Sequence, residues 1–193
     1  MTDRPPHSGP QEDNAVSPSI LVVIGVSGSG KTTVASMLAN RLGWEFEDAD
    51  WFHPPQNVAK MESGTPLTDE DRWAWLGAIS HWIGATHAKG HHGVVACSAL
   101  KRAYRDILVG ELGNAVRIVY LHGTRALIGS RLSMRHGHFM PPELLDSQFG
   151  ALEEPAPDEH AIIVSIDGHP RDIVENIVDA LETETERPLP DGP

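Results

Sequence analysis

The sequence has a single cysteine, Cys97, which excludes a disulfide within the chain. Cys97 ends an apolar run, and this position predicts a buried structural thiol rather than a nucleophile. A chain without disulfides suits a reducing compartment, and we therefore expect it in the cytoplasm. No apolar stretch is as long as a membrane span, so the sequence does not indicate a membrane-embedded protein.

Basic residues are scarce as well. The chain has 15 lysines and arginines against 27 aspartates and glutamates, which gives a formal net charge of -12. Such a chain has no general attraction for nucleic acid or for an anionic membrane, and we expect neither as a partner. It can bind an anionic substrate only where its few cations are gathered at one site.

The 193 residues are enough for one domain with a single core. Residues 1–18 are rich in proline and polar side chains and lack the apolar segment of a secretory signal, so we predict a disordered N-terminal segment. The folded domain is expected at residues 19–183. Residues 184–193 resemble the N-terminal segment in composition and are expected to form a flexible tail.

Short apolar runs alternate along the chain with segments of helical periodicity. This alternation predicts an α/β fold in which a parallel sheet is covered by helices on both faces. In such a sheet, ligands bind outside the carboxyl ends of the strands. The strands are predicted at 19–25, 44–48, 94–97, 116–121 and 161–166, and the helices at 32–42, 54–61, 69–89, 98–111, 125–134, 142–152 and 171–181.

A glycine-rich loop follows the first predicted strand and matches the pattern GxxxxGK[ST]. Its glycines let the backbone approach phosphates closely, and its N–H groups and the following helix N-terminus attract anions. In this pattern the lysine reaches the β- and γ-phosphates and the hydroxyl ligates Mg²⁺. A chance glycine-rich turn would not need the strand before it and the helix after it. The predicted ATP-binding residues are Gly25, Val26, Ser27, Gly28, Ser29, Gly30, Lys31, Thr32 and Thr33.

Two carboxylates, Asp48 and Asp50, follow the second predicted strand, and His53 comes shortly after them. Alone, this cluster could equally be a solvated acidic turn. Beside a phosphate loop, we interpret Asp48 as holding Mg²⁺ through water, together with Thr32. Asp50 is then placed to orient a substrate hydroxyl, and His53 to contact other hydroxyls.

Several cations lie near predicted strand or helix ends. Arg72, in the first turn of a helix, is either a surface ion-pair partner or a fork that grips a substrate carboxylate. Lys101 and Arg105 are four residues apart, so in a helix they would share a face near the top of the sheet. The alternative for this pair is a basic helix surface.

Arg131 and Arg135 are also four residues apart, and Gly137 follows them. Two arginines that enter a glycine-hinged segment predict a mobile lid at about 134–142, which would close over the phosphates of ATP and exclude water. His136 and His138 form a weak metal-binding pattern, and we expect them to be solvent-exposed.

Four segments together resemble the gluconokinase family, the small P-loop type that is related to shikimate and adenylate kinases. They are DADWFHPPQNVAKMESGTPLTDEDRWAWL, CSALKRAYRDIL, VYLHG and SRLSMRHGHFMPPELLDSQFGALEEP, within residues 20–177. The resemblance implies a three-layer fold with a five-stranded parallel sheet and a mobile lid, and often a homodimer. It also implies that ATP phosphorylates D-gluconate to 6-phospho-D-gluconate.

On this hypothesis, Lys31, Asp50 and Arg131 are catalytic, and Asp50 accepts the proton of the gluconate hydroxyl. Arg131 and Arg135 also bind ATP. The sugar acid is bound by Asp50, His53, Arg72, Lys101 and Arg105, with Arg72 or Arg105 as the carboxylate fork.

Other functions are less well supported by the sequence. A kinase of shikimate or of another aldonate is the main alternative, but a shikimate kinase is expected to have a glycine triplet where this chain has Ser98-Ala99-Leu100. A GTPase would need an NKxD motif, which is absent. A nucleotide-binding protein without activity is disfavoured because every polar role is filled.

Overall fold

The computed structural model describes residues 17–134 and 142–186. Its centre is a five-stranded sheet with all strands parallel, in the order β2-β3-β1-β4-β5. This confirms the fold expected from the alternation of apolar runs and helical segments. The strands are β1 Ile20–Ile24, β2 Glu45–Asp48, β3 Gly93–Ala96, β4 Val116–His122 and β5 Ile162–Ser165.

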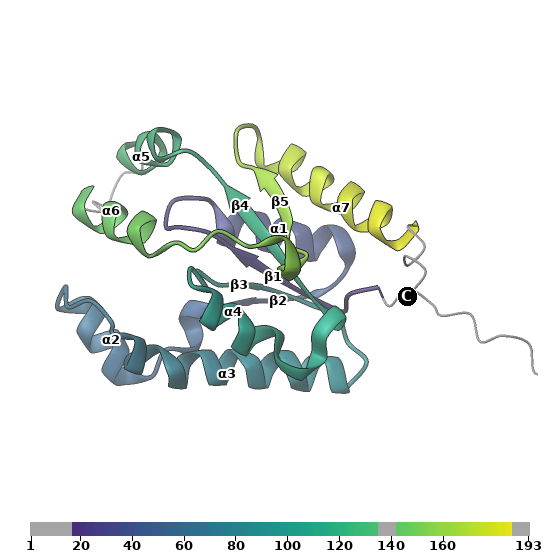
Figure 1. Ribbon diagram of the computed structural model, residues 1–193, viewed down its shortest axis with the longest axis horizontal. Coiled ribbons are helices and arrows are strands. Elements are labelled where there is room, and N and C mark those ends of the chain that lie inside the picture. Colours follow the sequence, from purple (N-terminus) through teal and green to yellow (C-terminus); the bar gives the residue numbers. More distant parts are fainter. Residues whose placement is uncertain (1–16, 135–141, 187–193) are drawn as a thin grey trace, which may run out of the picture.

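Helices cover both faces of the sheet and give three layers (Figure 1). Helices α3 and α4 pack on one face, and α1 and α7 pack on the other. The helices are α1 Lys31–Leu42, α2 Pro55–Glu62, α3 Asp69–Ala88, α4 Arg102–Val109, α5 Arg125–Ser133, α6 Pro142–Ala151 and α7 Pro170–Glu186, and short 3-10 segments lie at Ala49–Phe52, Gly110–Ala115 and Pro157–Glu159.

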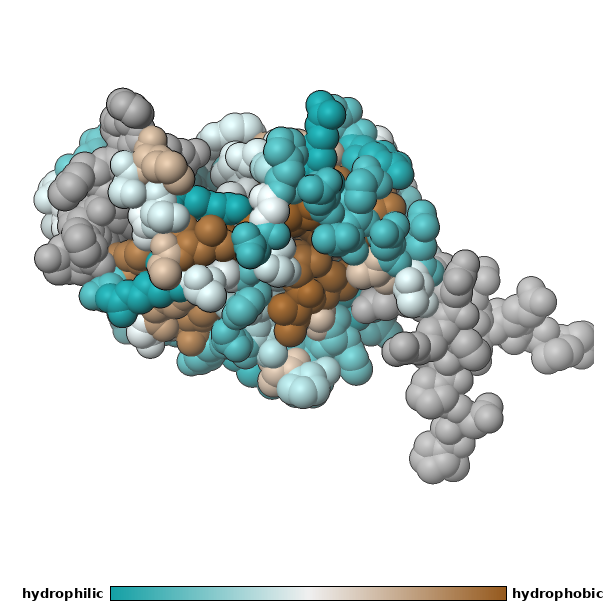
Figure 2. Space-filling model, turned by 90° about the horizontal axis from the view of Figure 1, so that it is seen from above, coloured by the Kyte–Doolittle hydropathy of each residue, from teal (hydrophilic) through white to brown (hydrophobic). Residues whose placement is uncertain are grey.

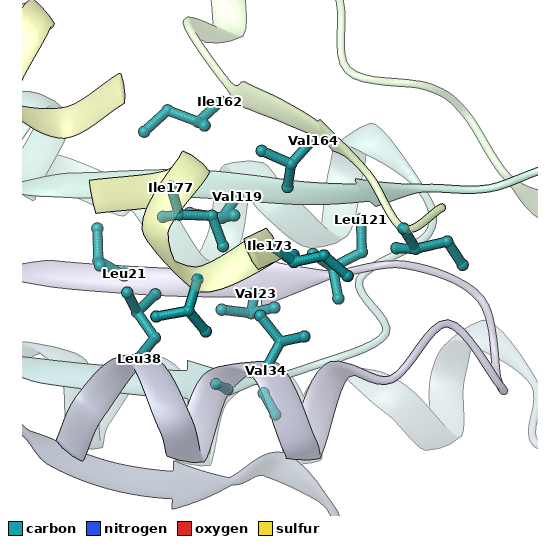
Figure 3. Close-up of a cluster of buried hydrophobic side chains, with 14 of the residues drawn as sticks. Leu21, Val23, Val34, Leu38, Val119, Leu121, Ile162, Val164, Ile173 and Ile177 are labelled. Carbon is teal, nitrogen blue, oxygen red and sulfur yellow. The ribbon is translucent and has the colours of Figure 1, made fainter. Parts of the chain in front are cut away.

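The central strand β1 is buried along its whole length, which explains why all its residues are apolar. On one face, Leu21 and Val23 pack in a cluster with Val34 and Leu38 of α1 (Figure 3). Ile173 and Ile177 of α7 belong to the same cluster, on the same face of the sheet as α1. The alternate residues of β1 face α3 and α4. Burial on both sides fixes β1, and with it the start of the phosphate loop.

The outer surface carries both apolar and hydrophilic side chains. Figure 2 shows one face of the molecule, where apolar surface is exposed between hydrophilic side chains. Among the residues that the structure describes, no helix is both long and apolar enough to cross a membrane.

The parallel strands bring distant segments together at one end of the sheet. In the register of the sheet, Val23 and Asp48 both pair with Ala96, and Ile24 pairs with Tyr120. The phosphate loop, the residues after β2 and the residues after β3 therefore leave the sheet side by side. Helices α2, α5 and α6 lie at this same end (Figure 1).

Two expected boundaries are wrong. Residues 98–101 are not helical: Ala99 has φ of +34° and Lys101 is extended, so that α4 starts at Arg102. Helix α7 continues to Glu186, beyond the predicted end of the last helix at residue 181. Residues 1–16, 187–193 and the centre of the expected lid, 135–141, lie outside the described residues.

Candidate active site

The phosphate loop is closely packed at both of its first glycines. Gly25 has φ of +149°, and a Cβ there would lie 2.9 Å from Ser29 Oγ and 3.1 Å from the Leu121 carbonyl oxygen. Gly28 has φ of +83°, and a Cβ there would come within 2.8 Å of Leu132 in α5. Glycine is therefore required at both positions, by backbone conformation and by space.

Lys31 is the first residue of α1, and its Nζ donates a hydrogen bond of 3.1 Å to the Val26 carbonyl oxygen. Burial lowers the pKa of Lys31, while the negative charges of Asp50 and Asp48 partly oppose this effect. The side chain of Cys97 lies near this ammonium group, but burial raises the pKa of the Cys97 thiol to about 12. Cys97 thus stays protonated, as expected of a structural thiol.

Asp48 connects the end of β2 to the phosphate loop. Its Oδ2 accepts a hydrogen bond of 2.8 Å from Thr32 Oγ1, and its Oδ1 accepts one of 3.1 Å from the Asp50 backbone N–H. A hydroxyl and a carboxylate oxygen held together are ligands that suit Mg²⁺. The same contacts place Asp50, whose side chain is exposed, at the edge of the phosphate loop close enough to act on the charge of Lys31.

The turn after Asp50 is fixed on helix α3. Trp75 Nε1 donates a hydrogen bond of 2.7 Å to the Ala49 carbonyl oxygen. The His53 ring stacks on Trp75, with centroids 4.5 Å apart and planes 8° apart. Burial lowers the pKa of His53, so the ring is neutral at pH 7. Its Nδ1 is buried and has no hydrogen-bond partner within the described residues.

Arg72 and Lys101 converge on one carboxylate, that of Asp69. Lys101 Nζ donates to both Asp69 oxygens at 2.9 and 2.7 Å, and Arg72 Nη1 lies 3.7 Å from Asp69 Oδ1. Tyr104 Oη donates to the same carboxylate at 2.5 Å, and both cations lie within 6 Å of the Tyr104 ring centre, at 5.9 and 5.6 Å. These hydrogen bonds hold the pKa of Asp69 below its ordinary value. Two cations and one anion leave this group, the acceptor cluster, with one net positive charge.

The start of α3, which bears Asp69 and Arg72, is fastened to α2. Thr68 caps the helix: its hydroxyl accepts from the Asp71 N–H, and the Asp71 carboxylate accepts from the Thr68 N–H. Lys60 Nζ binds both Asp71 oxygens at 2.6 and 2.8 Å, and Asn57 Nδ2 donates to the Asp71 carbonyl oxygen at 2.8 Å. The cap and the contacts with α2 together fix the position of Arg72.

The expectation that Arg105 binds the substrate is wrong. Its side chain is 1% exposed and forms a two-pronged pair with Glu159, with Nε–Oε2 and Nη2–Oε1 distances of 2.5 and 2.8 Å. Its Nη1 donates to the carbonyl oxygens of Ala99, Leu100 and Glu153. Because α4 starts only at Arg102, Lys101 and Arg105 do not share a helix face. Arg105 instead lines a hollow of about 370 Å³ at the start of β4, together with Arg102 and Glu159.

Arg131 lies on α5 next to Leu132, the residue that packs on Gly28. Its Nη2 donates to the Ile166 carbonyl oxygen at 2.5 Å and lies 3.5 Å from that of Gly168, in the loop between β5 and α7. Arg135, His136 and His138 lie outside the described residues. Within the described residues there is no group of three or more histidine, cysteine, aspartate or glutamate side chains that could hold a metal ion.

The structure adds three polar residues that the sequence did not single out for the site: Asp69, Tyr104 and Gln148. Gln148 of α6 accepts a hydrogen bond of 2.6 Å from the Ser27 backbone N–H. Gln148 is 121 residues from its partner Ser27, and Tyr104 is 35 residues from its partner Asp69. No local pattern in the sequence therefore reveals these contacts.

Comparison with known proteins agrees with this geometry. A family model described as shikimate kinase matches residues 27–182. A gluconokinase of Gluconobacter oxydans (strain 621H) is 46% identical over 167 residues, which cover 86% of this chain and 93% of that protein. A probable gluconokinase of Mus musculus is 44% identical over 181 residues, with 86% and 98% covered.

Solved structures give the same result. The crystal structure of a gluconokinase from Sinorhizobium meliloti 1021 matches with a TM-score of 0.80 at 40% identity, covering 88% of this chain and 95% of that one. The chain therefore belongs to the gluconokinase family, within the wider group of P-loop kinases that the shikimate kinase model describes.

Proposed function

We propose that the protein transfers the terminal phosphoryl group of ATP to the primary hydroxyl of D-gluconate, giving 6-phospho-D-gluconate and ADP. The observation that carries the proposal is the contact between Thr32 and Asp48, because it brings the end of β2 to the phosphate loop. Asp50 then stands between the donor loop and the acceptor cluster. The family relationship names gluconate as the acceptor, since the contacts at the site alone specify only an anion with hydroxyl groups.

The donor half is the phosphate loop. We assign the backbone of residues 25–33 and the ammonium group of Lys31 to the phosphates of ATP. Thr32 would hold Mg²⁺ directly and Asp48 would hold it through water, which fits the oxygen atoms that meet there. When bound, the ion offsets charge on the phosphate oxygens. Arg131 is assigned to ATP because its neighbour Leu132 already touches the loop, and we retain Arg135 as a second proposed arginine.

We assign the acceptor cluster to the binding of the sugar acid. Its single net positive charge matches the single carboxylate of an aldonate. With Arg105 excluded, Arg72 is the guanidinium left for a two-pronged contact with that carboxylate, and Lys101 adds a second charge. The neutral His53 ring can form hydrogen bonds with sugar hydroxyls and adds no charge to the site.

Transfer requires one proton to move. The C6 hydroxyl oxygen attacks the γ-phosphorus, the bond from that phosphorus to the bridging oxygen breaks, and ADP departs with the electron pair. The hydroxyl proton passes to the carboxylate of Asp50. Positioning and charge stabilisation supply most of the rate, because phosphoryl transfer needs little covalent help from the protein.

The test is ADP release with a panel of acceptors: D-gluconate, other aldonates, shikimate and nucleoside monophosphates. The account predicts the highest kcat/KM with D-gluconate. A response to shikimate or a nucleotide without a response to any aldonate would overturn it. A shikimate acceptor is not favoured. A shikimate kinase is expected to have a glycine triplet at residues 98–100, and this chain has the buried side chains of Ala99 and Leu100 there.

We also propose that the protein is a cytoplasmic homodimer. Cys97 is buried and unpaired, in keeping with a reducing compartment. Ile163 of the edge strand β5 is 59% exposed, which leaves apolar surface for a second copy. Light scattering coupled to size exclusion should give twice the mass of one chain, and a single-chain mass at micromolar concentration would contradict the dimer.

A further inference from the structure

Gln148 is joined to the phosphate loop through the peptide group between Val26 and Ser27. The N–H of this group donates to Gln148 Oε1 at 2.6 Å, and its carbonyl oxygen accepts from Lys31 Nζ at 3.1 Å. One peptide group therefore links the ammonium that reaches the β- and γ-phosphates to an amide on α6. A positive charge at the carbonyl polarises the peptide and strengthens its N–H as a donor.

The segment that follows the last turn of α6 is joined to the acceptor side of the site. Directly after α6, the Glu153 N–H donates to the Leu100 carbonyl oxygen at 2.8 Å, and the Arg102 N–H donates to the Glu153 carboxylate at 2.6 Å. Lys101 of the acceptor cluster lies between these two anchored residues. Arg105 binds the Glu153 carbonyl oxygen as well, at 2.9 Å, and so fixes this joint to the core.

The last turn of α6 and the residues after it, from Gln148 to Glu153, thus connect the donor loop to the segment that carries Lys101. Backbone N–H groups of the loop and Lys31 are the groups that bind ATP phosphates. When the phosphates draw Lys31 away from Val26 and compete for the Ser27 N–H, Gln148 has to give up or share its partner. A short segment that is held at Gln148 and at Glu153 passes such a change on to residues 100–102.

We propose that Gln148 is a positioning residue that couples occupancy of the phosphate loop to binding of the anionic acceptor. The inference rests on the proposed function for the identity of the acceptor, D-gluconate. Coupling between two sites is reciprocal, so ATP and D-gluconate should each tighten the binding of the other by the same factor.

The test is a calorimetric measurement of the Kd of a non-hydrolysable ATP analogue with and without saturating D-gluconate, and of the reverse pair. The wild-type protein should show a coupling of about 5-fold or more. Gln148→Leu, which keeps the bulk but removes the amide, should reduce it below about 2-fold. The matched control is Asp146→Asn, on the same helix but paired with Arg125 of α5, and it should leave the coupling unchanged.

Absence of coupling in the wild-type protein, or unchanged coupling in Gln148→Leu, would overturn the inference. If Gln148→Leu does not fold, Gln148→Asn keeps the amide but withdraws it by one methylene, and it should lose the coupling too. A readout without acceptor separates this inference from the proposed function. The side-chain amide signals of Gln148 in ¹⁵N NMR should shift when the ATP analogue is added, and unchanged signals would contradict the role of Gln148 even if gluconate is phosphorylated.

Discussion

Thr32 Oγ1 donates a 2.8 Å hydrogen bond to Asp48 Oδ2, and this contact joins the first residues of α1 to the end of β2. It exists because β3 lies between β1 and β2 and all three strands point the same way. Two segments sixteen residues apart therefore form one edge of a site. The proposed chemistry depends on that edge, since Asp50 lies only two residues after Asp48.

Replacement of Asp50 by asparagine removes the proposed proton acceptor and keeps the shape of the side chain. We predict that kcat falls by about 10² to 10⁴-fold, with little change in the KM for ATP. Steady-state ADP release measures both. The control is Glu45→Gln, which changes an exposed carboxylate at the start of β2 that pairs with His91, and it should retain wild-type turnover. Near wild-type kcat in Asp50→Asn would rule out its role as base.

ATP binding should depend on pH through Lys31. Because burial lowers the pKa of Lys31, its positive charge is lost at a lower pH than the ordinary lysine value of 10.5. Affinity for an ATP analogue is therefore predicted to be full at neutral pH and to decline on the alkaline side before pH 10.5. Titration calorimetry across this range measures the decline. Lys31→Arg, which stays charged, should lack it, and an identical decline in that variant would assign it to another group.

Arg72 is predicted to recognise the acceptor carboxylate. Arg72→Met should raise the KM for D-gluconate by about 10-fold or more, because one charge-assisted contact is lost, while the KM for ATP stays unchanged. The variant should also discriminate less between D-gluconate and D-glucitol, which has no carboxylate. Arg41→Met, which breaks an exposed pair with Glu175, is the control. Equal losses with both acceptors would show that Arg72 does not bind the carboxylate.

Arg105 should matter for stability instead. Arg105→Met leaves Glu159 as an unpaired buried charge, and we predict a loss of about 3–5 kcal/mol in the free energy of unfolding. The double variant Arg105→Met with Glu159→Leu should recover much of it, since neither charge remains buried. Urea unfolding measures these values. A stable Arg105→Met protein whose only defect is a raised KM for gluconate would restore the substrate-binding role.

Most of the fold was predictable because its signals are local. Four of the five strands are short apolar runs that end at glycine or polar residues, and burial of β1 on both faces explains its unbroken apolar sequence. The predicted helix at 98–101 failed because tertiary contacts prevail there over helix propensity. The Leu100 carbonyl oxygen accepts from the Glu153 N–H, a partner that no local pattern reveals.

The candidate site, like the fold, has parts that local sequence signals reveal and parts that they do not. The phosphate loop and Asp48 were identified from short motifs, and the structure brings them into contact. Arg105 was misassigned because its partner Glu159 is 54 residues away, and only the fold shows that the pair is buried. Residue spacing says which side chains can meet, but burial decides whether a cation faces the substrate or the core.

The most direct test of the central claim is the identity of the product. Purified protein with equimolar ATP and D-gluconate and excess Mg²⁺ can be followed by ³¹P and ¹³C NMR. We predict that the γ-phosphate signal of ATP disappears while a phosphate monoester coupled to C6 of gluconate appears in equal amount. Intact ATP after many expected turnovers, or a phosphate ester on another carbon, would contradict it.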